Sequence, residues 1–206
     1  MKEKIVIIGA GGFGREVFAL IDKDIFEVAG FIDNGSVPDT RLPAPVLGND
    51  SIIPHLKSRQ ISSVFIAIGN MQVRRKLFDI VRKAGLSLPS VIHKSATVLT
   101  SIPIGEGIIV YPAVVVMNDC SIGDGVLLNS GVTLGHDVSI GDFSNINPGA
   151  HVAGQVQIGQ NTMIGIGASI RENINIGNRV IAGAGSVIIK DVPDDTTVYG
   201  VPAKKR

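Results

Sequence analysis

An aliphatic residue occupies every sixth position through the second half of the chain, with no insertion between repeats. We call this series the first ladder, and it consists of Ile92, Val98, Ile104, Val110, Val116, Ile122, Leu128, Leu134, Ile140, Ile146, Val152, Ile158, Ile164, Ile170, Ile176, Ala182 and Ile188. An α-helix repeats about every 3.6 residues and a half-buried strand about every 2, so neither gives this spacing. The pattern therefore indicates a structural repeat of six residues.

Two further series refine the repeat. A second ladder of small or aliphatic residues lies four positions after the first, from Ala96 to Val192. Glycines recur eighteen residues apart, at Gly105, Gly123, Gly141, Gly159 and Gly177. Three hexads therefore make one turn of a solenoid, and each hexad supplies a short strand and a corner. We expect both ladders to point inward, and glycine to supply unusual dihedral angles at some corners.

The first half of the chain has a different pattern, in which apolar strands alternate with helices. Strands are predicted over residues 4–8, 28–32 and 63–68, and helices over 13–22, 50–57 and 71–84. The proline-containing stretch 34–48 is predicted to be a loop. This alternation favours a small parallel sheet, about half of a dinucleotide-binding fold. Because Leu88-Pro89 breaks the pattern just before the first ladder, we predict two domains, residues 1–88 and 89–206.

Composition narrows the functional classes. The net charge is +1 and no Lys- or Arg-rich run precedes the last three residues, which disfavours a nucleic-acid partner. No apolar run reaches the roughly 18 residues of a membrane span. The apolar start at Ile5 runs into a glycine loop, which is unlike a signal peptide. We expect a soluble, intracellular protein whose single cysteine, Cys120 on the second ladder, is a buried apolar residue.

A glycine loop follows the first predicted strand. Gly9-Ala10-Gly11-Gly12-Phe13-Gly14 fits the G-x-G-x-x-G pattern between a strand and a helix, with Asp33 at the end of the next strand. Glycines let backbone N–H groups approach a pyrophosphate, and a helix N-terminus favours its negative charge. Because the half-sized sheet has no second mononucleotide unit, we expect a nucleotide sugar rather than NAD. A tight turn without a ligand is the alternative.

One of the four histidines lies where a solenoid can expose it. His136 is two residues past the ladder residue Leu134, near a corner, and Asp137 follows it. Imidazole ionises near neutral pH, which suits removal of a proton from an attacking amine or hydroxyl, and a carboxylate can fix its tautomer. From the residues alone, a solvated surface histidine is the ordinary interpretation. The other three, His55, His93 and His151, are predicted to be structural or surface residues.

The repeats and the end of the chain resemble a known family. The hexads are similar to those of the left-handed β-helix acyltransferases, and Gly200-Val201-Pro202-Ala203-Lys204 resembles their closing motif. With a nucleotide-binding domain ahead of the solenoid, the chain resembles one branch, the bacterial acetyltransferases of nucleotide-linked amino sugars. That branch includes the bacillosamine-type and sialic acid O-acetyltransferase-like proteins. The resemblance implies a left-handed coil, a homotrimer and acetyl-CoA as co-substrate. Independently of it, a repeat fold needs its end capped, so we expect residues 192–206 to fold back or to reach a neighbour.

The resemblance also implies the catalytic and acetyl-CoA residues. Asn129, His136 and Asp137 match the catalytic segment in order and spacing, which implies His136 as general base, oriented by the other two. The implied acetyl-CoA residues are Asn145, Gly154, Ile166, Gly183, Ala184 and Gly185, and the implied oxyanion donor is the N–H of Gly154. Asn145 stands where relatives often have histidine, and it cannot transfer a proton near neutral pH. Glycine at a corner can also be required by the fold alone.

Further residues are implied at the two ligands. For the nucleotide sugar they are Gly9, Gly11, Gly12, Phe13, Gly14, Asp33, Asn34, Gly69, Asn70 and Arg74. Among these, Phe13 stands where relatives often have histidine, and Arg74 is expected near the phosphates unless it is a solvated helix residue. The candidates for the CoA phosphates are Arg171, Arg179, Lys190 and Lys204 to Arg206.

The expected reaction is direct transfer of an acetyl group from acetyl-CoA to the amine of a UDP-, dTDP- or GDP-linked 4-amino-4,6-dideoxy sugar, at a subunit interface. O-acetylation of a sialic acid-type sugar would use the same base. A zinc carbonic anhydrase on the same prism needs a three-histidine site, and no closely spaced histidine pair exists, so no metal is expected. A non-catalytic nucleotide-binding scaffold is disfavoured by the presence of both the glycine loop and the His-Asp pair.

Overall fold

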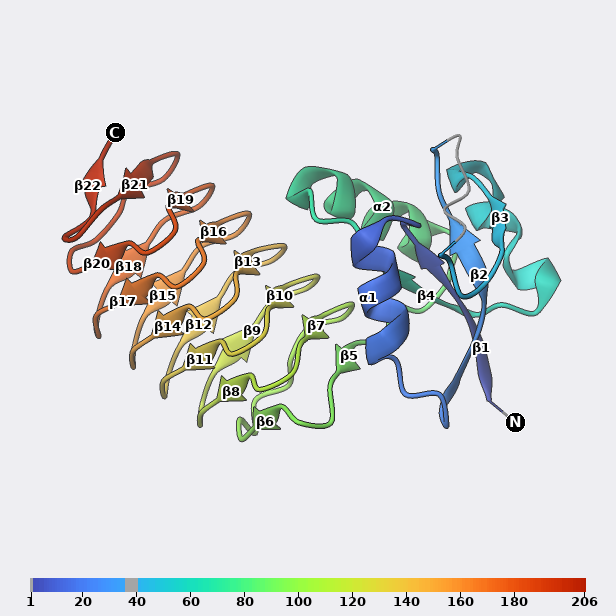
Figure 1. The fold of residues 1–206 in the computed structure, drawn as a ribbon, viewed down its shortest axis with the longest axis horizontal. Helices are drawn as coiled ribbons and strands as arrows, with labels where there is room; N and C mark the ends of the chain where they lie inside the picture. Colours follow the sequence, from blue (N-terminus) through green and yellow to red (C-terminus); the bar gives the residue numbers. More distant parts are fainter. Residues whose placement is uncertain (1, 36–40) are drawn as a thin grey trace. The chain divides into compact units, whose positions relative to one another are not determined.

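The computed structural model describes residues 2–35 and 41–206, and the chain divides into two compact units, Met1–Val91 and Ile92–Arg206 (Figure 1). The first, the N-terminal unit, is a parallel sheet with α-helices, and the second, the repeat unit, is a left-handed parallel β-helix. The predicted fold class is therefore confirmed for both halves. Among the described residues, no helix is long and apolar enough to cross a membrane.

The N-terminal unit contains a four-stranded sheet in the order β3-β2-β1-β4, with all neighbours parallel. Its strands are β1 (Glu3–Ile8), β2 (Phe26–Ile32), β3 (Val46–Gly48) and β4 (Ser63–Ile66). Its helices are α1 (Gly12–Leu20) and α2 (Met71–Lys83), and two 3-10 helices span Asp50–His55 and Lys57–Arg59. Residues Ile5–Ile8 of the central strand β1 and all four residues of β4 are buried, as expected of a parallel sheet covered on both faces.

The prediction that residues 34–48 form a loop was wrong at its end, because β3 lies there; residues 36–40 of that stretch lie outside the described residues. The prediction rested on the prolines of this stretch, which do not prevent a strand from following them. Pro45 precedes β3, and its carbonyl oxygen accepts a 2.8 Å hydrogen bond from the N–H of Phe31. A strand at the edge of a sheet tolerates neighbouring prolines, because only one side of its backbone pairs.

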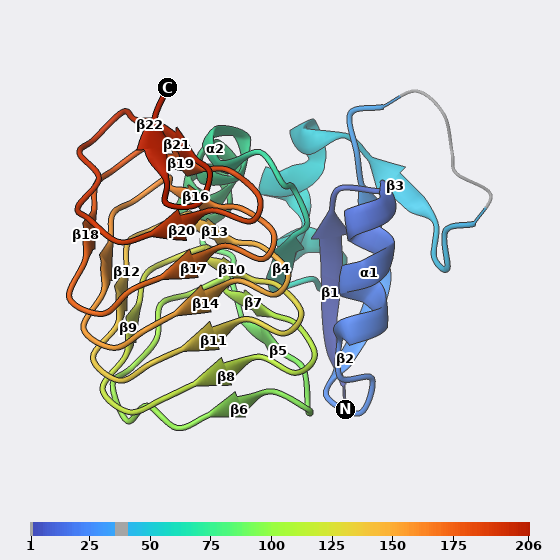
Figure 2. The ribbon, with the colours of Figure 1, turned by 60° about the vertical axis from the view of Figure 1, so that its left-hand side comes forward.

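Each turn of the repeat unit adds a short strand to up to three sheets, and neighbouring strands are parallel up to β21 (Figure 2). The eight-stranded sheet contains β5 (Val91–Ile92), β7 (Ile109–Val110), β10 (Leu127–Leu128), β13 (Asn145–Ile146), β16 (Met163–Ile164), β19 (Ile181–Ala182), β21 (Thr197–Tyr199) and β22 (Lys204–Lys205). The six-stranded sheet contains β6 (Thr97–Val98), β8 (Val115–Val116), β11 (Thr133–Leu134), β14 (His151–Val152), β17 (Ser169–Ile170) and β20 (Val187–Ile188). The four-stranded sheet contains β9 (Ser121–Ile122), β12 (Ser139–Ile140), β15 (Gln157–Ile158) and β18 (Asn175–Ile176).

Both ladders form the core of the repeat unit. From Val110 to Ile188 the first ladder is buried, and the second is buried from Ile108 to Val192. The prediction that every member points inward was wrong in the first turn, where Ile92 is 45% and Ile102 38% exposed. In the described residues no strand is formed between β6 and β7, so the first turn is less regular than those that follow.

The backbone conformation at the corners also repeats every six residues. Positive φ occurs at every sixth residue, at Gly107, Ala113, Asp119, Gly125, Gly131, Asp137, Phe143, Gly149, Gln155, Asn161, Gly167, Asn173, Arg179 and Gly185. Each of these residues directly precedes a member of the second ladder. Glycine is therefore one of several residues at these corners, although other L-residues in this conformation cost roughly 1–2 kcal/mol each.

The glycines of the eighteen-residue series have a different role from the predicted one. None of the five has a positive φ. A Cβ added at any of them would lie 2.5–2.8 Å from a backbone nitrogen of the next turn, which is closer than real Cβ atoms approach. Glycine is needed there because successive turns touch.

The C-terminal segment folds back on the last turn. β21 pairs parallel with β19, and β22 pairs antiparallel with β21. The N–H of Val187 donates to the carbonyl of Gly200, and the N–H of Ala203 donates to the carbonyl of Val187. These bonds cover backbone groups of the final turn that would otherwise lack a partner.

The two kinds of glycine predict different costs for the same substitution. In Gly141→Ala the new methyl group meets the backbone of Gln160, so we expect a loss of about 3 kcal/mol in unfolding free energy, at the upper end for overpacking. In Gly131→Ala the methyl group meets nothing within 4 Å, and only the positive φ opposes it, at about 1 kcal/mol. Thermal unfolding at equal protein concentration compares the two. Equal losses would contradict the steric role of the eighteen-residue series.

Candidate active site

Packing requires two glycines of the N-terminal loop. Gly9 has a φ of +107°, and a Cβ there would lie 2.5 Å from the carbonyl oxygen of Ala67. A Cβ on Gly14 would overlap the carbonyl oxygen of Gly9. These glycines let α1 pack close against the end of β1, whether or not a ligand binds.

The other glycines near the loop are not explained by packing. A Cβ added to Gly11 or Gly69 would meet no atom within 4 Å, and one added to Gly12 would meet only the Arg15 side chain at 3.9 Å. All three lie exposed at the carboxyl ends of β1 and β4, where parallel sheets bind ligands. Their open surroundings leave room for a phosphate group to approach backbone N–H groups.

Asp33 and Asn34 connect the loops around this edge of the sheet. Asp33 Oδ2 accepts a 2.6 Å hydrogen bond from the N–H of Ala10, and Oδ1 accepts one of 2.6 Å from Gly35. The Asn34 side chain donates to Asp50 Oδ2 at 2.6 Å and accepts from the Asp50 N–H at 3.2 Å. Both residues thus hold the glycine loop and its neighbours in place, and their contacts to the nucleotide sugar stay predictions.

Arg74 is buried, so the interpretation of it as a solvated helix residue was wrong. Its side chain is 1% exposed, and Nη1 donates to the carbonyl oxygens of Ile68 at 2.9 Å and Gly69 at 3.3 Å. Burial lowers the pKa of Arg74 to about 10, which leaves the guanidinium charged at neutral pH. Arg74 therefore fixes the turn before α2, whose N-terminus is capped by the Asn70 side chain.

The sequence contained a signal for this burial. Arg74, Leu77, Phe78 and Val81 follow the helical spacing of a buried face, and all four are buried in α2. A charged residue on such a face is normally paired or bonded to the backbone. Arg74 follows that rule through the two carbonyl groups.

His136 and Asp137 form a hydrogen-bonded pair on an exposed corner of the repeat unit. Nδ1 of His136 lies 2.6 Å from Oδ2 of Asp137, and the side chains are 63% and 50% exposed. Asp137 has the left-handed corner conformation, with a φ of +60°. Because a carboxylate only accepts hydrogen bonds, the pair places the proton of neutral imidazole on Nδ1. Nε2 is then the free basic nitrogen.

The corner that carries this pair lies between the six-stranded and four-stranded sheets, and we call it the His136 corner. Gly154 lies on the same corner, eighteen residues and one turn later, between β14 and β15. A Cβ added to Gly154 would lie 2.7 Å from His136 Nε2. The free nitrogen therefore lies against the backbone of Gly154.

The remaining predicted acetyl-CoA residues lie elsewhere on the prism. The corner between the eight-stranded and six-stranded sheets, which we call the Ile166 corner, carries Ile166, Gly183, Ala184 and Gly185, together with Asn129 of the predicted catalytic residues. The Ile166 side chain there is 60% exposed. Asn145 is in β13 of the eight-stranded sheet, and it is 8% exposed.

Asn129 does not orient His136 within this chain. Its backbone N–H and Nδ2 both donate to the carbonyl oxygen of Ile146, at 2.9 and 3.4 Å, and in the described residues no hydrogen bond joins it to His136. The six residues between them, which include β11, cross a whole face of the prism, so within one chain the two side chains lie on different corners. Of the orienting residues, Asp137 alone contacts the imidazole here.

The basic residues predicted to bind the CoA phosphates also lie on different corners of the prism. Arg179 makes two 2.6 Å bonds to Asp195, which raise the pKa of Arg179 and lower that of Asp195. Arg179 is at the third corner, between β18 and β19, whereas Arg171 and Lys190 lie on the His136 corner. The guanidinium of Arg179 is thus committed to a carboxylate.

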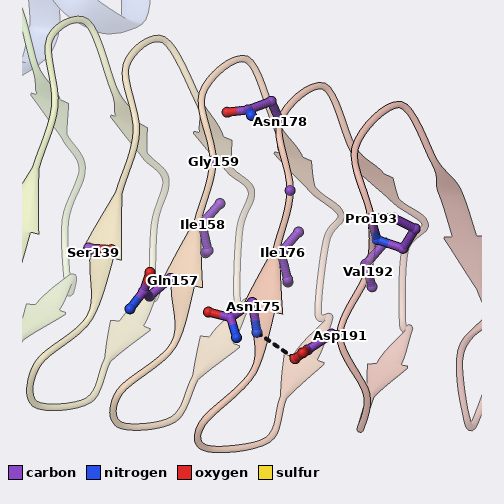
Figure 3. A pocket seen from close by; sticks show the side chains of 11 residues that line it. Ser139, Gln157, Ile158, Gly159, Asn175, Ile176, Asn178, Asp191, Val192 and Pro193 are labelled. Carbon is purple, nitrogen blue, oxygen red and sulfur yellow. Dashed lines mark hydrogen bonds between the residues drawn. The ribbon is translucent and has the colours of Figure 1, made fainter.

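Other candidate chemistry is absent from the site or lies away from it. Cys120 is fully buried, its thiol donates to the carbonyl of Gly135, and burial raises its pKa. Among the described residues, no group of three or more His, Cys, Asp or Glu side chains could hold a metal ion. A shallow cleft of about 440 Å³ on the four-stranded sheet is lined by polar residues such as Gln157, Asn175 and Asp191 together with aliphatic residues such as Ile158 and Ile176 (Figure 3). None of the predicted acetyl-CoA residues lines it.

Comparison with known proteins identifies relatives of both units. Residues 4–81 match the family described as PglD N-terminal domain, and residues 119–154 match the bacterial transferase hexapeptide (six repeats). PerB from Caulobacter crescentus, solved in complex with CoA and GDP-perosamine, is 35% identical, with 98% of this chain and 97% of that chain covered and a TM-score of 0.93.

Two further solved structures are similar over their whole length. The acetyltransferase domain of PglB from Neisseria gonorrhoeae FA1090, in complex with acetyl coenzyme A, is 35% identical, with 100% of both chains covered and a TM-score of 0.90. WeeI from Acinetobacter baumannii AYE is 32% identical, again with 100% of both chains covered, and has a TM-score of 0.85.

The buried guanidinium predicts a large difference between neighbouring arginines of α2. We expect Arg74→Leu to lower the unfolding free energy by about 2–4 kcal/mol, because it leaves two carbonyl groups without their donor. The exposed neighbour Arg75 supplies the control. We expect Arg75→Leu to change the unfolding free energy by about 0.5 kcal/mol or less. Urea unfolding of the full chain, followed by circular dichroism, measures both. Similar losses for the two variants would show that the Arg74 bonds are not important for stability.

Proposed function

Because this chain belongs to the left-handed β-helix family of nucleotide-sugar N-acetyltransferases, we propose that it transfers the acetyl group of acetyl-CoA to the amine of a nucleotide-linked sugar. The observation that carries the proposal is the exposed His136–Asp137 pair, with Nε2 free to accept a proton. The open glycine loop of the N-terminal unit supports a nucleotide as part of the acceptor. The GDP-perosamine complex of PerB supports an amino sugar over the O-acetylated alternative. We place the reaction in the cytoplasm, where acetyl-CoA is available.

In the proposed mechanism the sugar amine attacks the thioester carbon while His136 Nε2 removes its proton. The C–N bond forms, the tetrahedral intermediate collapses, the C–S bond breaks, and the imidazolium returns the proton to the CoA thiolate. The Asp137 carboxylate stabilises the imidazolium through its 2.6 Å bond to Nδ1. The N–H of Gly154, on the same corner, is the donor we assign to the developing oxyanion.

The transfer is proposed to be direct, without an acyl-enzyme. A cysteine nucleophile must reach solvent and form a thiolate easily. Cys120 does neither, because it is 0% exposed and burial raises its pKa.

We propose that the complete site forms in a homotrimer. The implied acetyl-CoA residues are divided between two corners of one prism, with Gly154 on the His136 corner and the others on or next to the Ile166 corner. Packing the His136 corner of one subunit against the Ile166 corner of the next would bring the two sets together. That arrangement also gives Asn129 a route to the imidazole that a single chain does not offer.

The general base has a direct kinetic test. We expect His136→Ala to lower kcat by about 10²–10⁴-fold, since proton transfer by a positioned side chain contributes that much, with little change in the KM for acetyl-CoA. The control is His151→Ala, which removes another exposed imidazole that bonds to Thr133. Steady-state kinetics should leave the control near the wild-type rate. Wild-type turnover in His136→Ala would exclude His136 as the base.

The acceptor class is tested by release of free CoA in the presence of UDP-, dTDP- and GDP-linked 4-amino-4,6-dideoxy sugars. We expect turnover with one of the three nucleotides, and none with the matching 4-hydroxy sugars, because an amine is the better nucleophile toward a thioester. Sialic acid serves as the O-acetylation control. Activity on sialic acid with none on the amino sugars would overturn the proposed acceptor.

A further inference from the structure

We infer that Gly154 is a positioning residue for His136. Because Gly154 has no side chain, the catalytic imidazole can pack against its backbone and is held in place there. This inference rests on the proposed function, in which His136 is the general base. It adds a role that is separate from the oxyanion contact of the Gly154 N–H. The role belongs to the missing side chain rather than to the backbone donor.

The closest contacts of the missing side chain all belong to one residue, His136. A Cβ on Gly154 would lie 2.7 Å from Nε2, 2.9 Å from Cε1 and 3.1 Å from Cδ2 of His136, and these are its three nearest heavy atoms. At Gly135, on the preceding turn, an added Cβ would instead meet the backbone of the next turn, with 2.6 Å to the nitrogen of Gly154. The closest obstacle at Gly135 is thus the backbone of the next turn, whereas at Gly154 it is the imidazole ring.

Backbone conformation gives no second reason for glycine at this position. The residues of this corner with positive φ are Asp119, Asp137, Gln155 and Asn173, and Gly154 is not among the positive-φ residues of the chain. An alanine can therefore adopt the backbone of residue 154 without strain of its own. Its methyl group would displace the ring.

The column of residues along the His136 corner shows what is special about this turn. Successive turns place Asn118, His136, Gly154, Glu172 and Lys190 above one another, eighteen residues apart. Gly154 alone in this column has no side chain, and it directly follows the histidine. The imidazole can therefore lie along the corner over the next turn, which any other residue of the column would prevent.

Two contacts then fix a ring that is otherwise open to solvent. The side chain of His136 is 63% exposed, and an exposed side chain ordinarily samples several rotamers. The Asp137 carboxylate holds Nδ1, and the backbone of Gly154 lies under the opposite edge. Together they direct Nε2 along the corner that also carries the Gly154 N–H, which we assign to the oxyanion of the thioester.

A double-mutant cycle separates this role from the backbone donor, because Gly154→Ala keeps the N–H and changes only the side chain. We expect Gly154→Ala to lower kcat by about 10²-fold, the effect of misplacing a catalytic group by about 1 Å. In a His136→Ala background, the same substitution is expected to change the residual kcat by about twofold or less. The KM for acetyl-CoA is expected to change little in either background.

Glu172→Ala is the matched control, since it shortens a side chain on the same corner one turn beyond Gly154 and is expected to keep wild-type kcat. Crystal structures of the wild type and of Gly154→Ala add a readout that does not depend on activity, with the ring expected to leave Gly154 in the variant. Non-additive losses together with a displaced ring support the positioning role.

Three outcomes overturn it. An equal loss from Gly154→Ala in both backgrounds would show that residue 154 acts on the oxyanion or on CoA and not through His136. Wild-type kcat in Gly154→Ala, or a ring that stays in place, would show that the absence of a side chain at residue 154 does not position the imidazole. Wild-type turnover in His136→Ala would remove the proposed general base and the positioning role with it, and so is distinguishable from the first two.

Discussion

Stacking of backbone on backbone at a fixed interval is the constraint on which the repeat unit depends. Consecutive turns pair strand to strand at the usual spacing of about 4.8 Å, and residue i lies over residue i+18. At that distance, the space available to a side chain is set by the residue one turn away. The glycines of the eighteen-residue series, the buried ladders and the place of the His136 imidazole all follow from this single register.

The sequence was informative wherever the structure repeats. The six-residue ladder predicted the solenoid, the burial of Cys120 and the exposure of His136, because an inward or outward direction follows directly from a position in the hexad. It did not reveal which residues adopt positive φ. That conformation falls on alanine, phenylalanine, glutamine and arginine as well as on glycine, so no residue type marks it.

Predictions that concern contacts between segments were less complete. A hydrogen bond such as that from Ala10 to Asp33, or the two from Arg74, depends on where separate loops meet, and local pattern does not specify it. Asn129 illustrates the limit for the catalytic site. Its order and spacing relative to His136 match the resemblance, yet the fold places it on another corner, and in the homotrimer that we propose a second copy of the chain would supply the contact. A site built between copies is not visible in the geometry of one.

The column of residues along the His136 corner has a consequence for how such enzymes diverge. Because each turn advances by about 4.8 Å, side chains that point in the same direction from the corner can differ in position only by multiples of that distance. Exchanging a histidine with the residue eighteen positions away would move the imidazole by one turn along the corner without altering the direction in which it points. Lengthening a hexad by one residue would instead rotate every later side chain around the axis. Sugar acceptors of different length are therefore more readily accommodated by substitution along the corner, in steps of one turn, than by insertion into a hexad.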